Sequence, residues 1–317
     1  MGYRFKRKES IDGGVRRTGC ERIQRALSRF DEVADPLEAV HDVRKDIKKV
    51  RALLRLMSHG LPPKVFRRDA RLLRKTAALL AGVRDARVKL QTFQKVTEHF
   101  QRQLDNRPFP GIHKALEVYC DGQGKLFLES ESTTRVIDLL HKIEGHVEDW
   151  GIDADEWLAI APGFLSTYRR GRREHELVQE KPSAKNFHEW RKRVKDLGYQ
   201  LRLVRGAWPE MIRPTIEAVN QLGEYLGDDH DAAILKDDLL GDELSAPLEE
   251  VEALAALIDQ RQRELRACAL ILGARLYAEK PGAFCDRLRA YWCQWRRVDA
   301  KVLDNADVAL PLRQLAA

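Results

Sequence analysis

Two stretches of this sequence decide its fold: HDVRKDIKKVRALLRL at residues 41–56 and HEWRKRVKDLGYQLRL at residues 188–203. They align without a gap, and each begins with a histidine that is followed by basic residues at matching positions. The aligned pairs are His41 and His188, Arg44 and Arg191, Lys45 and Lys192, Lys48 and Lys195, and Arg55 and Arg202. Apolar residues recur in both stretches at i, i+3, i+4 and i+7, which predicts two amphipathic helices.

The surroundings of the two stretches repeat as well. Arg25 and Arg172 precede their histidines by the same distance, and GVRDARV corresponds to GDDHDAAI with one inserted residue, which places Asp85 opposite Asp231. Self-similarity of this kind predicts a duplicated helical unit. We therefore expect two pseudo-symmetric halves, residues 1–150 and residues 151–317, with the seam between residues 144 and 161.

Helical periodicity extends over almost the whole chain, and no alternating strand pattern of useful length competes with it. Clusters of Gly, Pro, Asn and Asp interrupt it and predict helix breaks. The predicted breaks lie at 58–63, 105–111, 121–124, 161–163, 180–186, 206–210, 241–247 and 279–283. We predict an all-α protein of roughly eight to ten helices in antiparallel bundles. Asp85 and Asp231 are expected near helix starts, where the helix dipole favours an acid.

Each of the two repeated helices carries its basic residues on one face. On a wheel of about 100° per residue, the first helix groups its cations within about 80° of His41, opposite its apolar residues. This first stripe consists of Arg44, Lys45, Lys48, Arg51 and Arg55. The second stripe consists of His188, Arg191, Lys192, Lys195 and Arg202. The helix predicted before Arg84 carries a third basic face, which consists of Lys64, Arg67, Arg68, Arg71, Arg74 and Lys75.

Two interpretations of these stripes compete. A solvated helix face usually mixes signs, because opposite charges at i,i+4 stabilise a helix by ~0.2–0.5 kcal/mol and like charges destabilise it by a similar amount. The stripes lack this mixture, since Asp42, Asp46, Glu189 and Asp196 lie off them. Because the same self-repulsion occurs in both halves, we favour a polyvalent anion as ligand over an ordinary solvated surface. Arg and Lys both suit phosphate oxygens.

Composition indicates the charge of the protein and the cellular compartment in which we expect it. The 317 residues include 56 Lys and Arg against 49 Asp and Glu, which gives a net charge of +7. Eleven of the acids lie between residues 228 and 260, so the rest of the chain is more basic than this sum suggests. The five cysteines form no CxxC pair, which fits a reducing compartment. No apolar stretch approaches the ~18 residues of a spanning helix, so we expect a cytoplasmic protein with no membrane contact.

The two repeated stretches resemble the two signature helices of the CHAD family, the conserved histidine α-helical domain. GVRD from Gly82 and LGDDHDA from Leu226 also resemble later elements of the family, and the resemblance extends from about Val15 to Arg297. It implies two pseudo-symmetric helical bundles that enclose a basic central groove for inorganic polyphosphate. The groove residues that the resemblance implies are Arg25, His41, Arg44, Lys45, Lys48, Arg172, His188, Arg191, Lys192 and Lys195.

Further candidates for the groove come from the basic faces and their neighbours. They are Arg51, Arg55, Arg71, Arg74, Arg84, Tyr199 and Arg202. The chain departs from the family pattern at Gly198, where the second signature helix commonly carries Arg. The second half also lacks a counterpart to the third basic face. We therefore expect binding to lean toward the first half.

Two other functions stay open. Single-stranded nucleic acid would be attracted by the same surface, but the stripes offer only Tyr199 for stacking on bases, so we expect at most weak nucleic-acid binding. A metal-dependent phosphohydrolase would use ligands such as His41 and His230, but the aspartate-rich stretch GDDHDAAILKDD has Ala232 at the position where an acid is needed one turn after Asp228 and Asp229. We predict non-catalytic binding of inorganic polyphosphate, without cofactor or metal; association with polyphosphate granules stays open.

Overall fold

A computed structural model describes residues 2–32, 36–104, 108–152, 156–241 and 243–297. This part of the chain contains eleven α-helices and one short 3-10 turn, and it contains no strand. The all-α prediction is confirmed, although the number of helices exceeds the eight to ten that we predicted.

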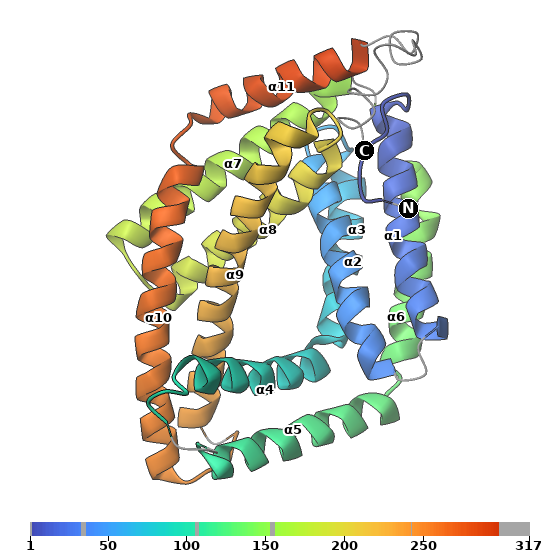
Figure 1. Ribbon diagram of the computed structural model, residues 1–317. Coiled ribbons are helices and arrows are strands. Elements are labelled where there is room, and N and C mark those ends of the chain that lie inside the picture. The colour runs from blue at the N-terminus through green and yellow to red at the C-terminus, as the bar shows by residue number, and fades with distance from the viewer. Residues whose placement is uncertain (1, 33–35, 105–107, 153–155, 242, 298–317) are drawn as a thin grey trace, which may run out of the picture.

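Eight of the helices form two groups of four, which stand on opposite sides of the molecule in Figure 1. The first group consists of α1 (Ile11–Glu32), α2 (Pro36–Leu56), α3 (Pro63–Leu79) and α6 (Ser132–Gly145). The second group consists of α7 (Glu156–Glu180), α8 (Ala184–Val204), α9 (Pro209–Leu240) and α10 (Leu248–Leu276). Each helix packs against two others of its group, so the two predicted bundles are present.

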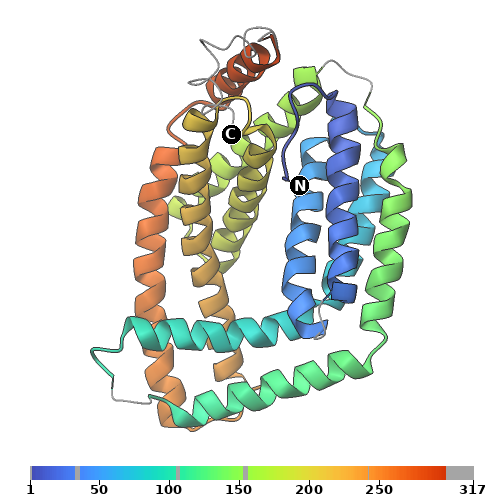
Figure 2. The same cartoon turned by 45° about the vertical axis from the view of Figure 1, so that its right-hand side comes forward.

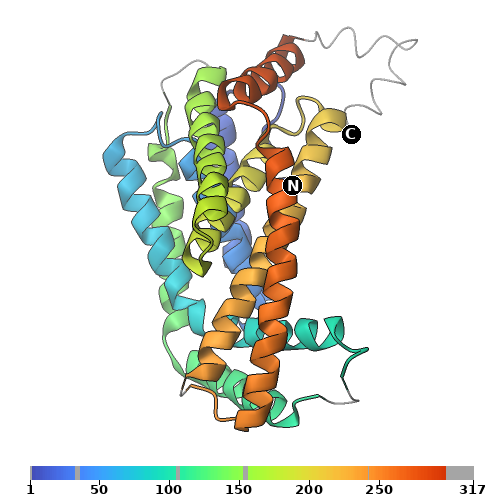
Figure 3. The same ribbon diagram turned by 90° about the vertical axis from the view of Figure 1, so that its left-hand side faces the viewer.

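Two helices link the groups. α4 (Ala81–His99) and α5 (Pro110–Glu129) pack against each other and cross from one group to the other, as Figures 1 and 2 show. α4 packs on α9 and α10, which are long antiparallel neighbours in Figure 3. Helices of the predicted first half thus contact the second half. The division at residue 150 and the internal duplication stay predictions.

Two shorter elements complete the described chain. The 3-10 turn Val147–Asp149 follows α6 and packs against it and against α1. The last helix, α11 (Pro281–Arg297), packs across α7 at one end of the molecule.

The apolar faces of α2 and α8 lie in one large core that both groups share. Val43, Ile47 and Val50 of α2 are buried, as are Trp190 and Val194 of α8. This burial confirms the phase that we predicted for both helices, and it turns their basic stripes away from the core. A second, smaller core lies between α4, α5 and the adjoining ends of α9 and α10.

Two predicted breaks are wrong, because helices continue through them. α5 runs through residues 121–124, and α7 runs through residues 161–163. In α7 the glycine serves a close approach between helices instead of a turn, since a Cβ on Gly163 would overlap the backbone of Leu56 at the end of α2. Small residues of this kind look like breaks in a sequence, but they are required where two helices touch.

The positions of Asp85 and Asp231 also differ from our prediction. α4 begins at Ala81, where Leu80 alone separates it from α3, and Asp85 lies in its second turn. Asp231 lies well inside α9. Neither acid is at a helix start; both instead lie beside the guanidinium of Arg84.

Candidate polyanion-binding site

α2 and α8 touch in their C-terminal halves. The guanidinium of Arg55 pairs with the buried carboxylate of Asp196 at 2.5 Å, and the side-chain amide of Gln200 donates to the carbonyl of Ala52 at 3.4 Å. Burial raises the pKa of Asp196, and the neighbouring Arg55 and Arg193 oppose that rise. Because these contacts hold the two helices against each other, other residues of both stripes come together beside them.

Five cations from three helices lie near one another, and we call them the cation cluster. They are Arg44 and Lys48 of α2, Arg84 of α4, and Arg191 and Lys195 of α8. Burial and then the other four members of the cluster lower the pKa of Lys48 to about 7. The Lys48 side chain nevertheless remains exposed to solvent. Lys48 is thus an exposed residue whose ammonium lies among like charges, where an anion from solution would relieve the repulsion.

Hydrogen bonds fix the guanidinium groups of Arg44 and Arg84. Nη1 of Arg44 donates to the carbonyl of Ala77 on α3 at 2.8 Å. Nη1 of Arg84 donates to Asp85 at 2.9 Å, and its Nη2 lies 3.6 Å from Asp231 on α9. A guanidinium has five N–H donors, so these contacts leave donors on both side chains for a ligand.

The two cations of α8 lie along α9, where glycines give them room. A Cβ on Gly223 would lie 3.1 Å from Nζ of Lys195, and a Cβ on Gly227 would lie 3.6 Å from Nε of Arg191. Burial lowers the pKa of both cations. Like charges add to this effect, since Arg84 lowers the pKa of Arg191 and Arg191 lowers that of Lys195. The fold therefore holds the cation cluster together against its own repulsion.

Two small cavities adjoin the cation cluster. One of about 240 Å³ lies between α2, α8 and α9, and its polar lining consists of Lys45, Lys195, Tyr199, Arg202, Asn220 and Glu224. The other, of about 100 Å³, lies between α2 and α3, and its basic lining consists of Arg51, Arg55 and Arg74. Lys195 joins the first cavity to the cluster. Arg51 lines the second cavity and lies near the cation cluster. Burial lowers its pKa, and so do the positive charges of Arg55, Arg74 and the cluster member Arg44.

The histidine of α8 has a partner that we did not predict for it. The rings of His188 and His230 lie 4.0 Å apart between centroids. Burial lowers the pKa of His188, and the charges of Lys192 and Arg191 lower it further. The pKa of His230 falls to about 3, because of burial and then because of His188, Arg191, Arg84 and Lys192. Both rings are therefore neutral near pH 7. The sequence alignment pointed to the adjacent Asp231, so the pairing of His230 with His188 had no signal in the repeat.

Four predicted site residues are not brought to the cation cluster. Arg25 pairs with the buried Asp46 at 3.5 Å, and Arg172 pairs with Glu176 on its own helix at 3.2 Å. His41 and Arg71 are exposed, and the described contacts do not join either of them to the cluster. The remaining predicted residue, Lys192, pairs with Glu189 beside His188.

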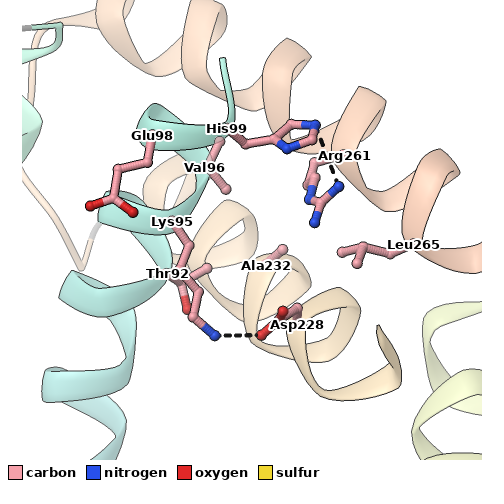
Figure 4. A pocket seen from close by; sticks show the side chains of 9 residues that line it. All are labelled: Thr92, Lys95, Val96, Glu98, His99, Asp228, Ala232, Arg261 and Leu265. Carbon is pink, nitrogen blue, oxygen red and sulfur yellow. Dashed lines mark hydrogen bonds and ion pairs between the residues drawn. The ribbon is translucent and has the colours of Figure 1, made fainter. Parts of the chain in front are cut away.

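A larger cavity, of about 340 Å³, lies between α4, α9 and α10 and is shown in Figure 4. Its cations are neutralised by carboxylates. Lys95 pairs with Asp228 at 2.8 Å, and Glu264 accepts from both Arg261 at 3.0 Å and His99 at 2.7 Å. This balance of charges contrasts with the excess of cations around Lys48, so the cation cluster is the better candidate for an anion site.

Two features are absent from the described residues. These residues contain no group of three or more His, Cys, Asp or Glu side chains that is arranged to hold a metal ion. None of their helices combines the length and the apolar character that are needed to cross a bilayer.

The fold and the cation cluster define an all-helical protein with a concentration of positive charge between two groups of four helices. The sequence matches the CHAD domain over residues 19–240, more than half of the chain, and the protein belongs to the CHAD family. This result confirms the resemblance seen in the signature helices, over a shorter range than we predicted. No curated protein matched the sequence.

Two solved structures share the fold. The crystal structure of the CHAD domain from the plant Ricinus communis superposes with a TM-score of 0.59 at 16% identity, covering 92% of this chain and 95% of that one. PptA from Streptomyces chartreusis also gives a TM-score of 0.59, at 14% identity, covering 86% of this chain and 100% of that one. At these identities the likeness shows the fold alone.

Proposed function

We propose that this protein binds inorganic polyphosphate without changing it chemically, and that the cation cluster is the centre of the binding surface. The observation that carries the proposal is the surroundings of Lys48. Four cations from α2, α4 and α8 lower the pKa of its ammonium, and the side chain is still open to solvent. Such repulsion is unfavourable in the free protein, and a chain of phosphates would relieve it. Membership of the CHAD family supports the same ligand.

The chemistry of the surface supports binding and not turnover. The guanidinium groups of Arg44, Arg84 and Arg191 suit phosphate oxygens through the N–H donors that their protein contacts leave, and the ammonium groups of Lys48 and Lys195 supply compact charges. The acids Asp85 and Asp231 lie beside Arg84. This arrangement supports a positioning role for the two carboxylates.

Single-stranded nucleic acid is the second candidate, because it carries the same phosphate charges. Binders of single strands stack bases on aromatic side chains. Tyr199 is the aromatic residue of the stripes, and its ring is already in contact on two sides, with Tyr3 edge to face at 6.4 Å and with the guanidinium of Arg202 at 5.4 Å. Trp190 is buried. This surface therefore favours a ligand that has phosphates and no bases.

The test is a titration of the full chain with long-chain polyphosphate, RNA and single-stranded DNA at matched phosphate concentration and salt. We expect polyphosphate to bind at least tenfold more tightly than either nucleic acid. Equal affinity for all three would point to a general phosphate-chain binder, and the absence of polyphosphate binding would rule out the proposal. Incubation of the complex and measurement of released orthophosphate tests the non-catalytic part, for which we expect no release above the protein-free control.

We also propose a cytoplasmic location. The five cysteines are all free thiols in the structure, which supports a reducing compartment. Fractionation of cells, with detection of the protein alongside polyphosphate granules, tests both the location and the association with granules.

A further inference from the structure

The segment that precedes α1 lies between α2 and α8, beside the surface just described. The hydroxyl of Tyr3 donates to the carbonyl of Lys49 on α2 at 2.9 Å, and its ring contacts that of Tyr199 on α8. The amide of Phe5 donates to the carbonyl of Leu203 near the end of α8 at 2.8 Å. Residues 2–5 therefore bridge the two signature helices, and Figure 2 shows the N-terminal end of the chain beside α2.

This bridge places Arg4 beside Arg205, the residue that follows α8. A Cβ on Gly2 would lie 3.6 Å from Nη2 of Arg205 and 3.9 Å from Nε of Arg4, so both guanidinium groups border the same small space. The backbone of Arg4 is fixed, because its carbonyl accepts a hydrogen bond from Arg17 of α1 at 2.8 Å. Two cations are thus held together at a surface that the signature helices alone do not form.

Arg213, near the start of α9, adds a third cation to this group. The pKa of Arg205 is lowered by burial and then by the positive charges of Arg4, Arg213 and Arg202. Among the described residues, no carboxylate lies within 4.0 Å of the guanidinium nitrogens of Arg4, Arg205 or Arg213. A cation at the C-terminal end of α8 is favoured by the helix dipole. That effect accounts for Arg205, but it does not account for the other two.

A continuous series of cations connects this group to the cation cluster. Arg202 lowers the pKa of Lys195, a member of the cluster, and also that of Arg205. Its orientation is fixed, since it donates to Asn220 at 2.9 Å and lies over the ring of Tyr199. The positive charge therefore continues from the cluster, along one side of α8, to the N-terminal segment.

We propose that Arg4, Arg205 and Arg213 form a second anion subsite, along which a long polyphosphate chain continues beyond the cation cluster. This inference rests on the proposed function and adds to it a preference for long chains, because only a long chain reaches both groups of cations. Arg4 lies outside the residues that match the CHAD domain. The subsite is thus built partly from a segment that the family match does not cover.

The test compares the parent chain with R4Q/R205Q/R213Q, using tripolyphosphate and long-chain polyphosphate as probes in isothermal titration calorimetry. We expect the affinity for tripolyphosphate to change by less than about twofold, because that probe occupies the cation cluster alone. The affinity for the long chain should fall about tenfold. The slope of log K against log salt should become shallower by about two, since each lost contact with a single-strand phosphate contributes roughly 0.7.

The matched control is K114Q/R263Q/R275Q, which removes the same charge from exposed positions on α5 and α10. We expect it to bind both probes like the parent. An equal loss in this control would overturn the second subsite, since net charge alone would then explain the effect.

Two further outcomes separate the subsite from the proposed function. Unchanged long-chain affinity in R4Q/R205Q/R213Q would overturn the subsite and leave the proposed function intact, whereas failure of the parent to bind either probe would overturn both. Because Arg205 lies at a helix end, R4Q/R213Q is measured as well. We expect it to lose about fivefold in long-chain affinity, and parent-like affinity in this folded variant would also overturn the subsite.

Discussion

The two signature helices carry matching sequences, yet the structure gives their cations different surroundings. On α2 the residues His41, Lys45 and Lys48 are exposed, whereas the aligned residues His188, Lys192 and Lys195 of α8 are partly buried. The helices that follow explain the difference. α9 continues unbroken beside α8, while the corresponding stretch after α2 is divided at Leu80 into α3 and α4, and α4 crosses to the other group.

On the proposed function, the same stripe would serve two purposes. Where α9 stays alongside, Arg191 and Lys195 are held in place before a ligand arrives, so little side-chain freedom is lost on binding. Where α4 crosses away, Lys45 and Lys48 stay accessible, and the crossing brings Arg84 into the cation cluster. We expect α8 to supply most of the free energy of binding and α2 to supply accessible charge. This expectation is the opposite of the lean toward the first half that the sequence suggested, and the following measurements decide between the two.

The largest effect is expected from removing four members of the cation cluster at once, in R44Q/K48Q/R191Q/K195Q. Polyphosphate affinity should fall about 100-fold or more, because each partly buried charge contact contributes on the order of 1 kcal/mol. Without ligand the variant should melt no lower than the parent, since Gln keeps helix propensity and the substitutions relieve repulsion. Thermal melting with and without polyphosphate measures both effects.

The control for this variant is K114Q/K125Q/R263Q/R275Q, which removes four exposed charges from α5 and α10. It should keep the thermal shift of the parent. If the fourfold variant of the cluster keeps full affinity, the assignment of the site is wrong; if it unfolds, the stripes are structural and the solvated-face interpretation is correct.

A smaller difference should separate single substitutions in the two helices. R191Q should weaken polyphosphate binding about tenfold, because Arg191 lies against α9 and is preorganised. K45Q should weaken it less than about threefold, because an exposed, mobile ammonium contributes little. Calorimetric titration of both variants checks the order. Equal losses would show that the burial of the α8 stripe has no consequence for binding.

The pH dependence of binding should come largely from Lys48. Its pKa is lowered to about 7 in the free protein, and a bound polyanion would raise it again. Below that value the ammonium is already charged. Above it, binding must take up a proton, so affinity should fall as pH rises from about 7 to about 9. His188 and His230 have lowered pKa values and stay neutral over this range.

K48R provides the control for this pH dependence, because a guanidinium remains charged throughout the range. We expect a several-fold loss of affinity between pH 7 and pH 9 in the parent and a flatter curve in K48R. Lys195, whose pKa is also lowered, would account for a slope that remains in K48R. Identical curves for the parent and K48R would show that Lys48 does not titrate on binding.

The signature helices α2 and α8 illustrate how much of the site the sequence predicts. Periodicity fixed which side of α2 and α8 is apolar, because the helical repeat alone determines the phase of Val43 and Trp190. It did not predict that the chain turns from α3 into α4 at Leu80, since Leu80 is neither Gly nor Pro and the direction of α4 depends on its packing against α9 and α10. The contact of His188 with His230 depends on the packing of α8 against α9, so the local sequence could not predict it.

The buried acids give a second example. Asp46 and Asp196 lie off the stripes, as we predicted. The sequence did not show that each acid would pair with an arginine that we had predicted to bind the ligand. Asp46 pairs with Arg25, and Asp196 pairs with Arg55. An ion pair with a buried carboxylate depends on which helices pack together. Removing one partner weakens the compensation of that buried charge, although Arg22 and Lys49 also pair with Asp46 and Arg193 also pairs with Asp196. We therefore expect substitutions of Arg25 and Arg55 to affect stability more than binding.

The smallest expected effect concerns the aligned histidines. His188 lies beside Arg191 and Lys192, whose charges act on it, whereas His41 is exposed and lies apart from the cation cluster. H188N should weaken polyphosphate binding about threefold, on the scale of a single neutral hydrogen bond, and H41N should leave it unchanged. Titration of both variants under the same conditions decides this. A greater loss in H41N would place the ligand nearer the N-terminal end of α2.

The most direct test of whether α2 and α8 hold the same ligand is the salt dependence of polyphosphate binding in the parent, in R44Q/K48Q and in R191Q/K195Q. Each neutralised phosphate contributes roughly 0.7 to the slope of log K against log salt for a single strand. We predict that each double variant lowers the slope by about 1.4, and that the fourfold variant lowers it by about twice as much. An unchanged slope in either double variant would mean that one helix binds the ligand alone, which would contradict a shared site.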